Sequence, residues 1–538
     1  MVHVRSDNSR TPVIPSIPVR TTADVVEALR GVVDAHLSMV ELRIDEFRND
    51  PGQIATTLCA CPDLCAILTA RSSREGGTCD ATFDDRLDLL MGARGESSAY
   101  VDVEWLDVAE DPERLGRVKE TIAEDRLIIS SHLLTPLDQP GALAALVRTR
   151  LTEMRGAFPR AIPKIAFTTA TIAETWTAFD LMHDAASNNN VPRPILIAMG
   201  GPGTWTRILG ARFGSSGCFG WWKAGGATAP GQLDARDLKG LYCVSSVGPD
   251  TRVYGVIGNP VGHSLSPTLH NFWFRQNGID AVYVPVEVDA TPAALSSFLD
   301  DCVARNWMNF GGFSITIPHK AHALHWAGDR ADRHAASIGA INTIAFLRDG
   351  IYATNTDCHA AVDAICMALD GRRIDLAGTS FDILGCGGAA IALCAALRDI
   401  GCPVTLYARN EERVQDVADS LNKSGRFVEP RSWNRLHERD GRIVANTTPV
   451  GMWPAVDDSP ITGDALVGSL LVFDMIYRPL ETKMLRDARE RGIRTLNGME
   501  MFLRQAAAQF ALWTGVDPDI AAGRAALLET LQRVQETD

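Results

Sequence analysis

Short apolar runs alternate with longer helical stretches through the first 235 residues of the chain. Eight runs have the length of a β-strand, at residues 13–19, 40–44, 65–69, 100–103, 127–130, 164–167, 195–199 and 218–221. Alternating strands and helices indicate a parallel sheet, and eight such units in under about 250 residues are typical of a closed barrel. The pattern therefore predicts an eight-stranded α/β barrel, although the first run is interrupted by prolines and the last is short.

Polar side chains sit at the C-terminal ends of these runs. They are Arg43, Arg71, His132 and Lys164, with Arg207 just downstream. In barrels of this kind the carboxyl ends of the strands carry the functional site. The sequence therefore predicts a charged site at one mouth of the barrel.

A second pattern follows a polar stretch at residues 231–239. A new apolar run at 253–257 places a domain border near Lys239, and residues 381–390 form a strand, a glycine-rich turn and the start of a helix. Gly385 and Gly387 permit a tight turn that approaches a pyrophosphate, while Gly388, Ala389 and Ala390 let the helix pack closely on the strand. Taken alone, this turn also fits a simple strand–helix junction.

The next strand, at residues 404–407, helps to choose the nucleotide. It ends in Arg409 and Asn410, with no carboxylate at its tip. Arginine there suits a 2′-phosphate, whereas aspartate would suit a free ribose. We expect NADP as the cofactor, although Glu411 and Glu412 lie close by.

Composition narrows the class of protein. The 538 residues are 46% hydrophobic and 22% charged, which indicates several soluble domains, and we find no apolar run of membrane-spanning length. A net charge of −14 argues against a nucleic-acid partner. The first 20 residues lack the apolar core of a signal peptide, and the twelve cysteines are expected to be reduced thiols without a metal, which suits a cytoplasmic protein.

Seven motifs in the second half resemble those of shikimate dehydrogenase, from about residue 253 to 515. They lie at residues 262–267, 312–320, 339–343, 355–357, 385–390, 446–452 and 498–505. The first half is similar to type I 3-dehydroquinate dehydratase over residues 13–236, through residues 41–45, 71, 75–77, 131–132, 163–166, 206–207 and 228–232. This order resembles the bifunctional enzymes of plants. It implies dehydration of 3-dehydroquinate to 3-dehydroshikimate, followed by NADPH-dependent reduction to shikimate.

The resemblance assigns roles in the barrel. It makes Lys164 the Schiff-base nucleophile and His132 the acid–base group, and it makes substrate ligands of Glu41, Arg43, Arg71, Glu75, Arg207, Thr228 and Gln232. Without it, Lys164 would be a solvated lysine, His132 a structural histidine and the others a salt-bridge network. Leu133 stands where the family usually has an acidic residue and Thr228 where it has serine, so we expect an active but slower dehydratase.

The resemblance also assigns roles in the second half. Lys320 and Asp357 would be catalytic, with Ser264, Ser266, Thr316, Asn342, Tyr477 and Gln505 binding the substrate. The cofactor would contact Gly385, Gly387, Gly388, Ala389, Ala390, Arg409, Asn410, Thr447, Met475 and Gly498. The plainer alternatives are a surface salt bridge for Lys320 with Asp357 and a helix cap for the two serines.

These expectations define four segments and two competing functions. Residues 1–12 form a tail, 13–238 the barrel, 246–357 with 499–538 a substrate lobe, and 358–498 a doubly wound, Rossmann-type NADP lobe. A quinate/shikimate dehydrogenase with a weak or inactive dehydratase half is one alternative. A quinate-sensing regulator is the other, but Lys164, His132, Lys320 and Asp357 are all present and no DNA-reading segment is visible. The expected partners are small-molecule substrates, and the oligomeric state stays open.

Overall fold

The protein divides into two compact units, which are described separately. The computed structural model describes residues 10–136, 141–187, 191–222, 231–422, 425 and 427–535. The first unit runs to Phe310 and the second covers Gly311–Arg533, so the border falls within β11 (Phe310–Ile315).

Eight parallel strands of the first unit form a nearly closed barrel, which confirms the predicted fold class. Their order is β7-β6-β5-β4-β3-β2-β1-β8, and β8 pairs with β1 to bring the ends of the sheet round. The strands are β1 (Val13–Pro18), β2 (Met39–Arg43), β3 (Cys65–Thr69), β4 (Tyr100–Glu104), β5 (Leu127–Leu133), β6 (Ile162–Thr168), β7 (Ile195–Met199) and β8 (Cys218–Trp221).

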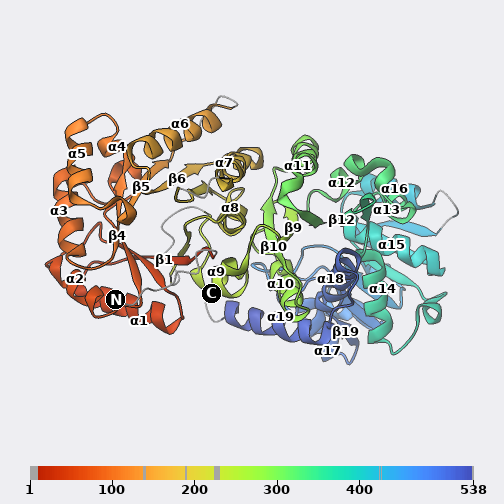
Figure 1. Cartoon of the computed structure of the whole chain (residues 1–538). Helices are drawn as coiled ribbons and strands as arrows, with labels where there is room; N and C mark the ends of the chain where they lie inside the picture. Colours follow the sequence, from red (N-terminus) through yellow and green to blue (C-terminus); the bar gives the residue numbers. More distant parts are fainter. Residues whose placement is uncertain are drawn as a thin grey trace. The chain divides into compact units, whose positions relative to one another are not determined.

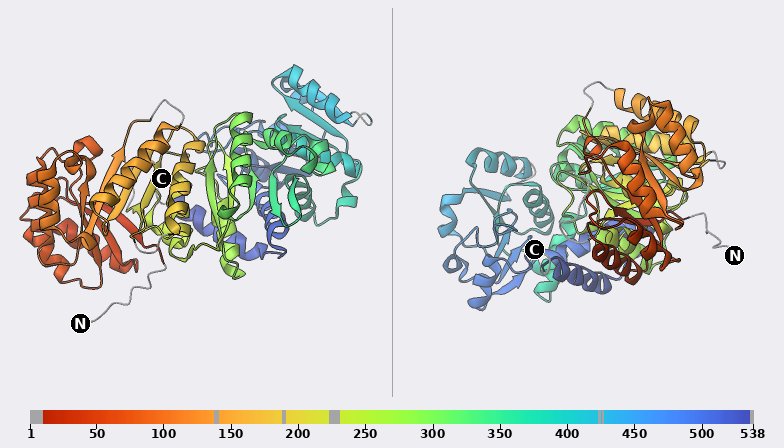
Figure 2. Two further views of the ribbon diagram at one scale, coloured as in Figure 1. Left: turned by 45° about the horizontal axis from the view of Figure 1, so that its top comes forward. Right: turned by 90° about the vertical axis from the view of Figure 1, so that its left-hand side faces the viewer.

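Helices lie outside these strands (Figures 1 and 2). They are α1 (Thr22–Asp34), α2 (Gly52–Cys59), α3 (Phe83–Arg94), α4 (Trp105–Val108), α5 (Pro112–Thr121), α6 (Ala142–Ala157), α7 (Trp176–Ala186), α8 (Thr204–Leu209) and α9 (Ala235–Gly240). Local sequence sets where they begin: Thr21 and Asp24 form a capping box at α1, and Asp111 caps α5 before Pro112.

An apolar cluster fills the inside of the barrel. It includes Ile14, Ile67, Ile128 and Ile195, which come from β1, β3, β5 and β7. Alternate strands of such a barrel contribute the side chains of one layer. The even-numbered strands β2, β4 and β6 contribute Glu41, Asp102 and Lys164 instead, so a buried charged group lies beside this apolar layer.

The rest of the first unit packs on the barrel. It comprises β9 (Arg252–Gly258), α10 (Ser266–Gln276), β10 (Ala281–Glu287) and α11 (Pro292–Ala304), with β9 and β10 paired in parallel. Phe298 of α11 stacks on Trp176 of α7 at 5.9 Å and lies 5.6 Å from the ring of Trp205. Trp205 and Phe298 are fully buried. These contacts join α11 and the barrel helices α7 and α8 in one apolar core.

The second unit contains an antiparallel group and a six-stranded parallel sheet. β11, β12 (Thr343–Leu347) and β13 (Gly350–Thr354) pair in antiparallel order. The parallel sheet has the order β16-β15-β14-β17-β18-β19, which is the 3-2-1-4-5-6 order of a dinucleotide-binding sheet. Its strands are β14 (Phe381–Leu384), β15 (Val404–Ala408), β16 (Val428–Ser432), β17 (Ile443–Asn446), β18 (Leu471–Asp474) and β19 (Arg494–Leu496).

Helices of the second unit precede, connect and follow these strands. They are α12 (Lys320–Ala327), α13 (Arg333–Ile338), α14 (Asp357–Ala368), α15 (Gly388–Ile400), α16 (Glu411–Leu421), α17 (Lys483–Glu490), α18 (Gly498–Thr514) and α19 (Ile520–Gln535). Small residues let α15 approach its sheet closely, since Ala390, Ala392, Ala395 and Ala396 are all buried in the core of this unit. This matches the close packing that the glycine- and alanine-rich sequence predicts.

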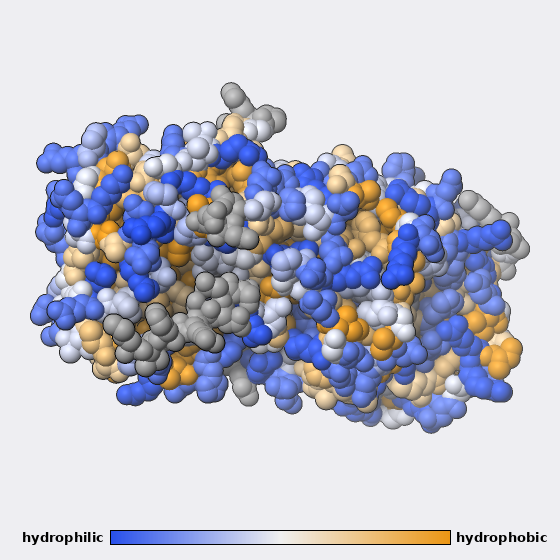
Figure 3. All heavy atoms as spheres, viewed as in Figure 1, coloured by the Kyte–Doolittle hydropathy of each residue, from blue (hydrophilic) through white to orange (hydrophobic). Residues whose placement is uncertain are grey.

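The surface carries no large apolar area on the face shown in Figure 3, where hydrophilic residues predominate and apolar residues form small patches. Among the described residues, every helix is too short or too polar to cross a bilayer.

Arg212 joins the barrel to the segment that follows it. Its buried guanidinium donates to the carbonyl oxygens of Pro249 at 2.7 Å and Trp307 at 3.2 Å, and also to that of Thr251. Arg212→Met would leave these acceptors without their donor, at a cost of about 1–3 kcal/mol for each one that stays buried. We expect a lower melting temperature in differential scanning calorimetry.

The matched control is Arg117→Met. Arg117 pairs with Asp84 and Asp88 at the surface, where such pairs contribute about 0–1 kcal/mol. Equal losses in the two variants would contradict the role given to Arg212.

Candidate functional site

A cavity of about 200 Å³ opens within the barrel. Eight of the side chains singled out from the sequence line it, namely Glu41, Arg43, Arg71, Glu75, His132, Lys164, Arg207 and Gln232. Apolar side chains, including Ile197, Met199 and Phe219, complete the wall. Thr228 lies outside the described residues. The structure thus brings together all of the described residues that were predicted for the first site.

Lys164 is held inside the barrel. It is the third residue of β6 and not its last, which corrects the expected position, because the strand extends from Ile162 to Thr168. Its Nζ donates to Glu41 Oε1 at 3.3 Å and to Asp102 Oδ2 at 3.2 Å, and it lies 4.1 Å from the ring centre of Phe219. Lys164 is only 4% exposed, so the alternative of a solvated lysine is wrong.

The two carboxylates beside Lys164 are anionic. Burial would raise the pKa of Glu41, but Lys164 and Arg43 outweigh it and the pKa lies below its ordinary value. Burial likewise opposes the charge of Asp102, whereas Arg71, Lys164 and the Ser130 hydroxyl lower its pKa. An ammonium group between two carboxylates must give up a proton before it can attack a carbonyl carbon.

Arg71 is surrounded by acidic groups of the protein. It donates to Asp102 Oδ1 at 2.9 Å and to Ser130 Oγ at 2.8 Å, and it pairs with Glu75 and Glu104 at 3.4 Å each. Burial would lower the pKa of Arg71, but Asp102, Glu75 and Glu104 raise it. A substrate bound by Arg71, as predicted, must therefore share the guanidinium with these internal partners.

His132 and Glu75 form a proton-sharing pair. Glu75 Oε2 lies 2.8 Å from His132 Nδ1 and accepts the backbone N–H of His132 at 3.1 Å. Burial raises the pKa of Glu75 to about 8, opposed by Arg71 and assisted by Glu104 and Asp102. Burial and the cations Arg71 and Lys164 lower the pKa of His132 well below its ordinary value. Both groups are therefore mainly neutral at pH 7. Glu75 orients the ring, a role for which the residue after His132, Leu133, is not needed.

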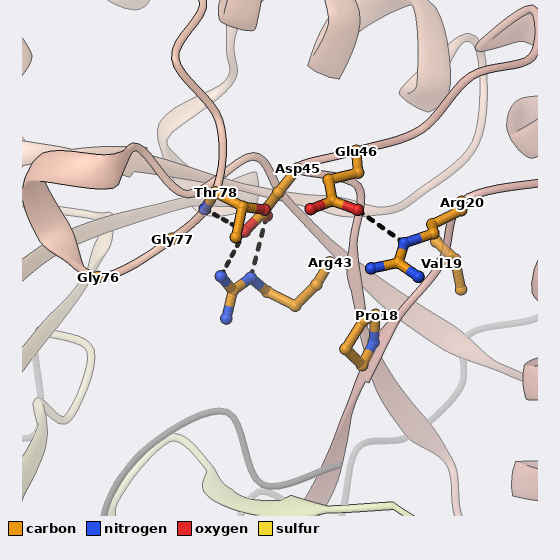
Figure 4. Close-up of a pocket in the computed structure, with 9 residues that line it drawn as sticks. All are labelled: Pro18, Val19, Arg20, Arg43, Asp45, Glu46, Gly76, Gly77 and Thr78. Carbon is orange, nitrogen blue, oxygen red and sulfur yellow. Dashed lines mark hydrogen bonds and ion pairs between the residues drawn. The ribbon is translucent and has the colours of Figure 1, made fainter. Parts of the chain in front are cut away.

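Two further predicted ligands, Arg43 and Arg207, line the barrel cavity. Asp45 holds Arg43 by two hydrogen bonds, at 3.1 Å to Oδ1 and 2.5 Å to Oδ2, and accepts the backbone N–H of Arg71 at 3.0 Å. Figure 4 shows this guanidinium pointing toward Asp45 in a neighbouring cavity of about 240 Å³. Burial lowers the pKa of Arg207, on α8, to about 10. Arg207 lines the barrel cavity of about 200 Å³, and a buried cation there suits an anionic ligand.

Most of the residues predicted for the second site lie in the second unit, which contains Lys320. Lys320 Nζ donates to Asp357 Oδ2 at 2.6 Å, and the two residues begin α12 and α14. Their side chains are 23% and 10% exposed, so the pair is partly buried. Asn355 Oδ1 accepts the backbone N–H of Asp357 at 3.0 Å and so fixes the start of α14.

A chain of contacts links this pair to three other predicted residues. Asn342 Oδ1 accepts the backbone N–H of Thr356 at 2.8 Å, and Thr356 Oγ1 donates to the carbonyl oxygen of Gln505 at 3.2 Å. Tyr477 stacks on Phe502, one turn before Gln505, at 5.1 Å. The helix α18 therefore brings the C-terminal part of the chain to residues near Lys320 and Asp357.

Ser264, Ser266 and Thr316 were also predicted for this site. Ser264 and Ser266 belong to the first unit, where Ser264 Oγ accepts the backbone N–H of Ser266 at 3.2 Å at the start of α10. Thr316 belongs to the second unit and follows β11 directly. Its backbone carbonyl oxygen accepts the backbone N–H of His319 at 2.9 Å. Part of the side-chain capacity of Ser264 is thus used in a local turn.

All ten predicted cofactor residues lie at the carboxyl edge of the six-stranded sheet or follow it directly. They come after β14, β15, β17, β18 and β19. Gly385 has a φ of +111°, and a Cβ there would lie 2.6 Å from Thr447 Oγ1, so glycine is needed. A Cβ at Gly387 or Gly388 would meet nothing within 4 Å. This open backbone at the N-terminus of α15 fits a pyrophosphate.

Arg409 and Asn410 differ in their availability. Arg409 is exposed at the end of β15, as a 2′-phosphate ligand requires. Asn410 Oδ1 accepts the backbone N–H of Arg413 at 2.9 Å and caps α16. The side chain of Asn410 therefore has a structural task that the sequence analysis did not assign to it.

Several residues of these sites were missed from the sequence. Asp102 alternates with Glu104 on β4, a pattern that would place both carboxylates on one face of a strand. Gln509 lies four residues after Gln505 on α18, accepts the hydroxyl of Ser314 at 2.7 Å and donates to the carbonyl oxygen of Asn342 at 3.1 Å. Spacing could have indicated both residues, but only tertiary contacts identify their partners.

Comparison with known proteins gives consistent matches in both halves. The family model for type I 3-dehydroquinase matches residues 14–249, that for the shikimate dehydrogenase substrate binding domain matches 256–344, and that for the shikimate 5′-dehydrogenase C-terminal domain matches 498–528. The chloroplastic bifunctional 3-dehydroquinate dehydratase/shikimate dehydrogenase of Arabidopsis thaliana is 36% identical over 502 residues, which cover 89% of this chain and 78% of the Arabidopsis protein.

Shorter relatives match the second half. Shikimate dehydrogenase (NADP(+)) of Methanosarcina mazei is 38% identical over 287 residues, covering 52% of this chain and 99% of that protein. A crystal structure of a shikimate dehydrogenase in complex with NADP+ is 32% identical and covers 52% of this chain and 96% of its own, with a TM-score of 0.47.

The raised pKa of Glu75 makes stability depend on pH. Its pKa rises from an ordinary 4.5 to about 8 in the folded protein, so between these values the unfolded chain releases a proton that the folded chain keeps. The contribution of Glu75 to the free energy of unfolding should fall as pH rises from 4.5 to 8 and then level off. His132, whose pKa the fold lowers from its ordinary 6.5, makes the opposite contribution below that pH. We expect Glu75→Gln to flatten this dependence, measured as melting temperature between pH 5 and 9.

Glu46→Gln serves as the control, because Glu46 pairs with Arg20 at the surface. If Glu75→Gln follows the wild-type pH curve as closely as Glu46→Gln does, Glu75 is not the group responsible.

Proposed function

The chain belongs to the bifunctional 3-dehydroquinate dehydratase/shikimate dehydrogenase family, and from that premise we propose how its residues carry out the two reactions. The barrel dehydrates 3-dehydroquinate to 3-dehydroshikimate as a lyase. The second half reduces 3-dehydroshikimate to shikimate as an NADP-dependent oxidoreductase. The observation that carries the proposal is the cavity in which Lys164, between two carboxylates, shares a wall with the His132–Glu75 pair.

Dehydration begins at Lys164. Its neutral amine attacks the keto carbon, and loss of the carbonyl oxygen as water leaves an iminium bond between substrate and Nζ. The iminium nitrogen withdraws electrons, so the neutral imidazole of His132 can take a proton from the adjacent carbon. The same ring then protonates the departing hydroxyl, which leaves as water. Hydrolysis of the iminium releases the product and the amine.

Glu41 and Asp102 serve the charged nitrogen throughout. Both oxygens that face Nζ belong to buried anions, and fixed charges stabilise a developing cation strongly where water is excluded. Arg207 supplies a buried cation for the substrate carboxylate, while Arg43, Arg71, Thr228 and Gln232 are assigned to the remaining polar groups of the substrate. Asp102 adds a residue to those expected from the sequence.

Reduction uses the partly buried pair in the second unit. NADPH, when bound, supplies the hydride. Lys320 donates a hydrogen bond to the substrate oxygen and delivers the proton, and Asp357 accepts from a substrate hydroxyl and holds Lys320 in place. Asn342 and Gln505, linked through Thr356, bind the ring hydroxyls together with Tyr477 and Thr316. Ser264 and Ser266 are assigned to the carboxylate.

The cofactor residues follow from the sheet edge. The open backbone at Gly387 and Gly388 would hold the pyrophosphate, Arg409 would pair with the 2′-phosphate, and Thr447, Met475 and Gly498 would contact the nicotinamide part. We assign the dehydratase to residues 13–238, the substrate lobe to 246–357 with 499–538, and the NADP lobe to 358–498. The proposal includes a cytoplasmic location, which the twelve free cysteines favour.

Each half reaction should depend on its own lysine. In a coupled assay from 3-dehydroquinate and NADPH, we expect wild type to oxidise NADPH and both Lys164→Ala and Lys320→Ala to abolish it. Supplied with 3-dehydroshikimate, Lys164→Ala should regain the wild-type rate and Lys320→Ala should not. Borohydride reduction with 3-dehydroquinate should leave a covalent adduct on Lys164, detected by peptide mass spectrometry.

Two results would contradict this assignment. One is a wild-type protein, shown to be folded, that does not consume NADPH in the coupled assay. The other is an unmodified Lys164 after borohydride treatment of an active dehydratase.

Asp102 should matter to the rate of dehydration. Asp102→Asn keeps the shape but removes an anion beside Nζ, and we expect kcat of the dehydratase to fall about 100-fold, as for loss of one preorganised charge-stabilising group. Asp107→Asn is the matched control, because Asp107 is also buried but pairs with Arg86 outside this cavity. Similar kcat values for the two variants would remove Asp102 from the catalytic group.

A further inference from the structure

Asp474 is a buried carboxylate at the carboxyl edge of the nucleotide-binding sheet. It ends β18 and is fully buried. Asp474 Oδ1 accepts the side-chain amide of Asn446 at 3.0 Å and the backbone N–H of Ile476 at 3.1 Å, and Oδ2 accepts the hydroxyl of Thr482 at 2.7 Å. Three neutral donors from three segments thus converge on one carboxylate.

One of these donors, Asn446, fixes the conformation of the turn after β17. Asn446 Oδ1 accepts the backbone N–H of Thr448 at 3.0 Å and its hydroxyl at 2.7 Å. The turn carries Thr447, whose Oγ1 donates to the carbonyl oxygen of Leu384 at 2.7 Å beside Gly385. Because Asp474 fixes the amide end of Asn446, it also fixes which way the amide oxygen points into this turn.

A second donor, the backbone N–H of Ile476, fixes the conformation of the segment after β18. Ile476 is held by Asp474 and its carbonyl oxygen accepts the backbone N–H of Gly498 at 3.0 Å. Met475 donates its backbone N–H to the carbonyl oxygen of Asn446 at 3.0 Å, and a Cβ at Gly498 would lie 2.1 Å from the carbonyl oxygen of Met475. Thr447, Met475 and Gly498, all assigned to the cofactor, therefore depend on one carboxylate for their relative positions.

This arrangement is costly for the folded protein. Burial raises the pKa of Asp474 to about 6, against the hydrogen bonds from Thr482, Ile476 and Asn446, which lower it. A buried charge without an opposite charge costs free energy that an apolar side chain would not. This cost indicates that Asp474 serves to position these segments and not only to stabilise the fold.

We propose that Asp474 is a positioning residue of the reductase, which sets the affinity for NADPH by holding residues 446–450 and 475–477 in register at the edge of the sheet. This inference rests on the proposed function of the second half. It adds a residue that contacts neither substrate nor cofactor but acts through Asn446 and Ile476.

The experiment compares Asp474→Ala with Asp474→Asn in the full-length protein. The dissociation constant for NADPH is measured by fluorescence titration without substrate, and KM and kcat for 3-dehydroshikimate are measured alongside. The alanine variant loses all three acceptor contacts, whereas asparagine can still accept from Asn446 and Ile476. We expect the dissociation constant to rise about tenfold or more for alanine and to stay within about threefold of wild type for asparagine.

The chain supplies two controls. Dehydratase activity reports the amount of folded barrel, and the number of NADPH sites found in the titration reports the folded fraction of the second unit. Asp382→Ala is the matched variant: Asp382 lies on β14 in the same sheet and is fully buried, with burial raising its pKa. It accepts the backbone N–H of Gly441 at 2.8 Å at the end of the strand opposite Gly385. Asp382→Ala should lower stability and leave the dissociation constant for NADPH unchanged.

The outcomes separate a positioning role from a purely structural one. A smaller active fraction with an unchanged NADPH dissociation constant for Asp474→Ala would overturn the proposal, as would an equal rise in Asp382→Ala or in Asp474→Asn. If Asp474→Ala does not fold, Thr482→Val decides, since it removes the hydroxyl that donates to Asp474 together with its cap contact to the backbone N–H of Leu485: a rise of about threefold supports the proposal, and no change overturns it. A wild type that binds NADPH but does not reduce 3-dehydroshikimate would refute the proposed function instead.

Discussion

The barrel depends on the compensation of one buried ammonium group. Lys164 lies inside the sheet, where an unpaired charge would be prohibitively costly. Glu41 and Asp102 supply the opposite charge from β2 and β4, and each anion needs hydrogen-bond donors of its own. The hydroxyls of Ser16, Thr69 and Ser130 meet that need from the neighbouring strands β1, β3 and β5.

The acid–base chemistry follows from the same compensation. Arg71 balances Asp102, and its charge, with that of Lys164, keeps the imidazole of His132 neutral. Glu104 and Asp102 add to the burial that raises the pKa of Glu75, so the carboxyl group beside His132 holds its proton near neutral pH. Two neutral groups that share a proton can act as base and then as acid without adding net charge to the cavity.

In the second half, hydrogen bonds of Asn and Asp side chains hold the segments around the proposed site. Its parallel strands end along one edge, where Asn446 and Asp474 hold the segments that leave the sheet. Asn342 and Asn355 hold the start of α14 beside the antiparallel strands. The phosphate-facing turn stays open because glycines occupy it. A dinucleotide brings its own charge, so a site for it needs exposed backbone donors and a few fixed side chains more than internal ion pairs.

The sequence by itself determined the eight strands of the barrel, the glycine turn of the second sheet and the motifs that carry each lysine. Those features are local: strand length, turn chemistry and motif spacing are written in neighbouring residues. The tertiary structure decided that Lys164 lies within β6, that Asp102 faces it, that Asn410 caps a helix and that Asp474 joins two turns. These facts depend on which side chains meet when distant strands become neighbours. Single-sequence patterns carry no such information, because strand alternation gives the face of a residue but not its partner.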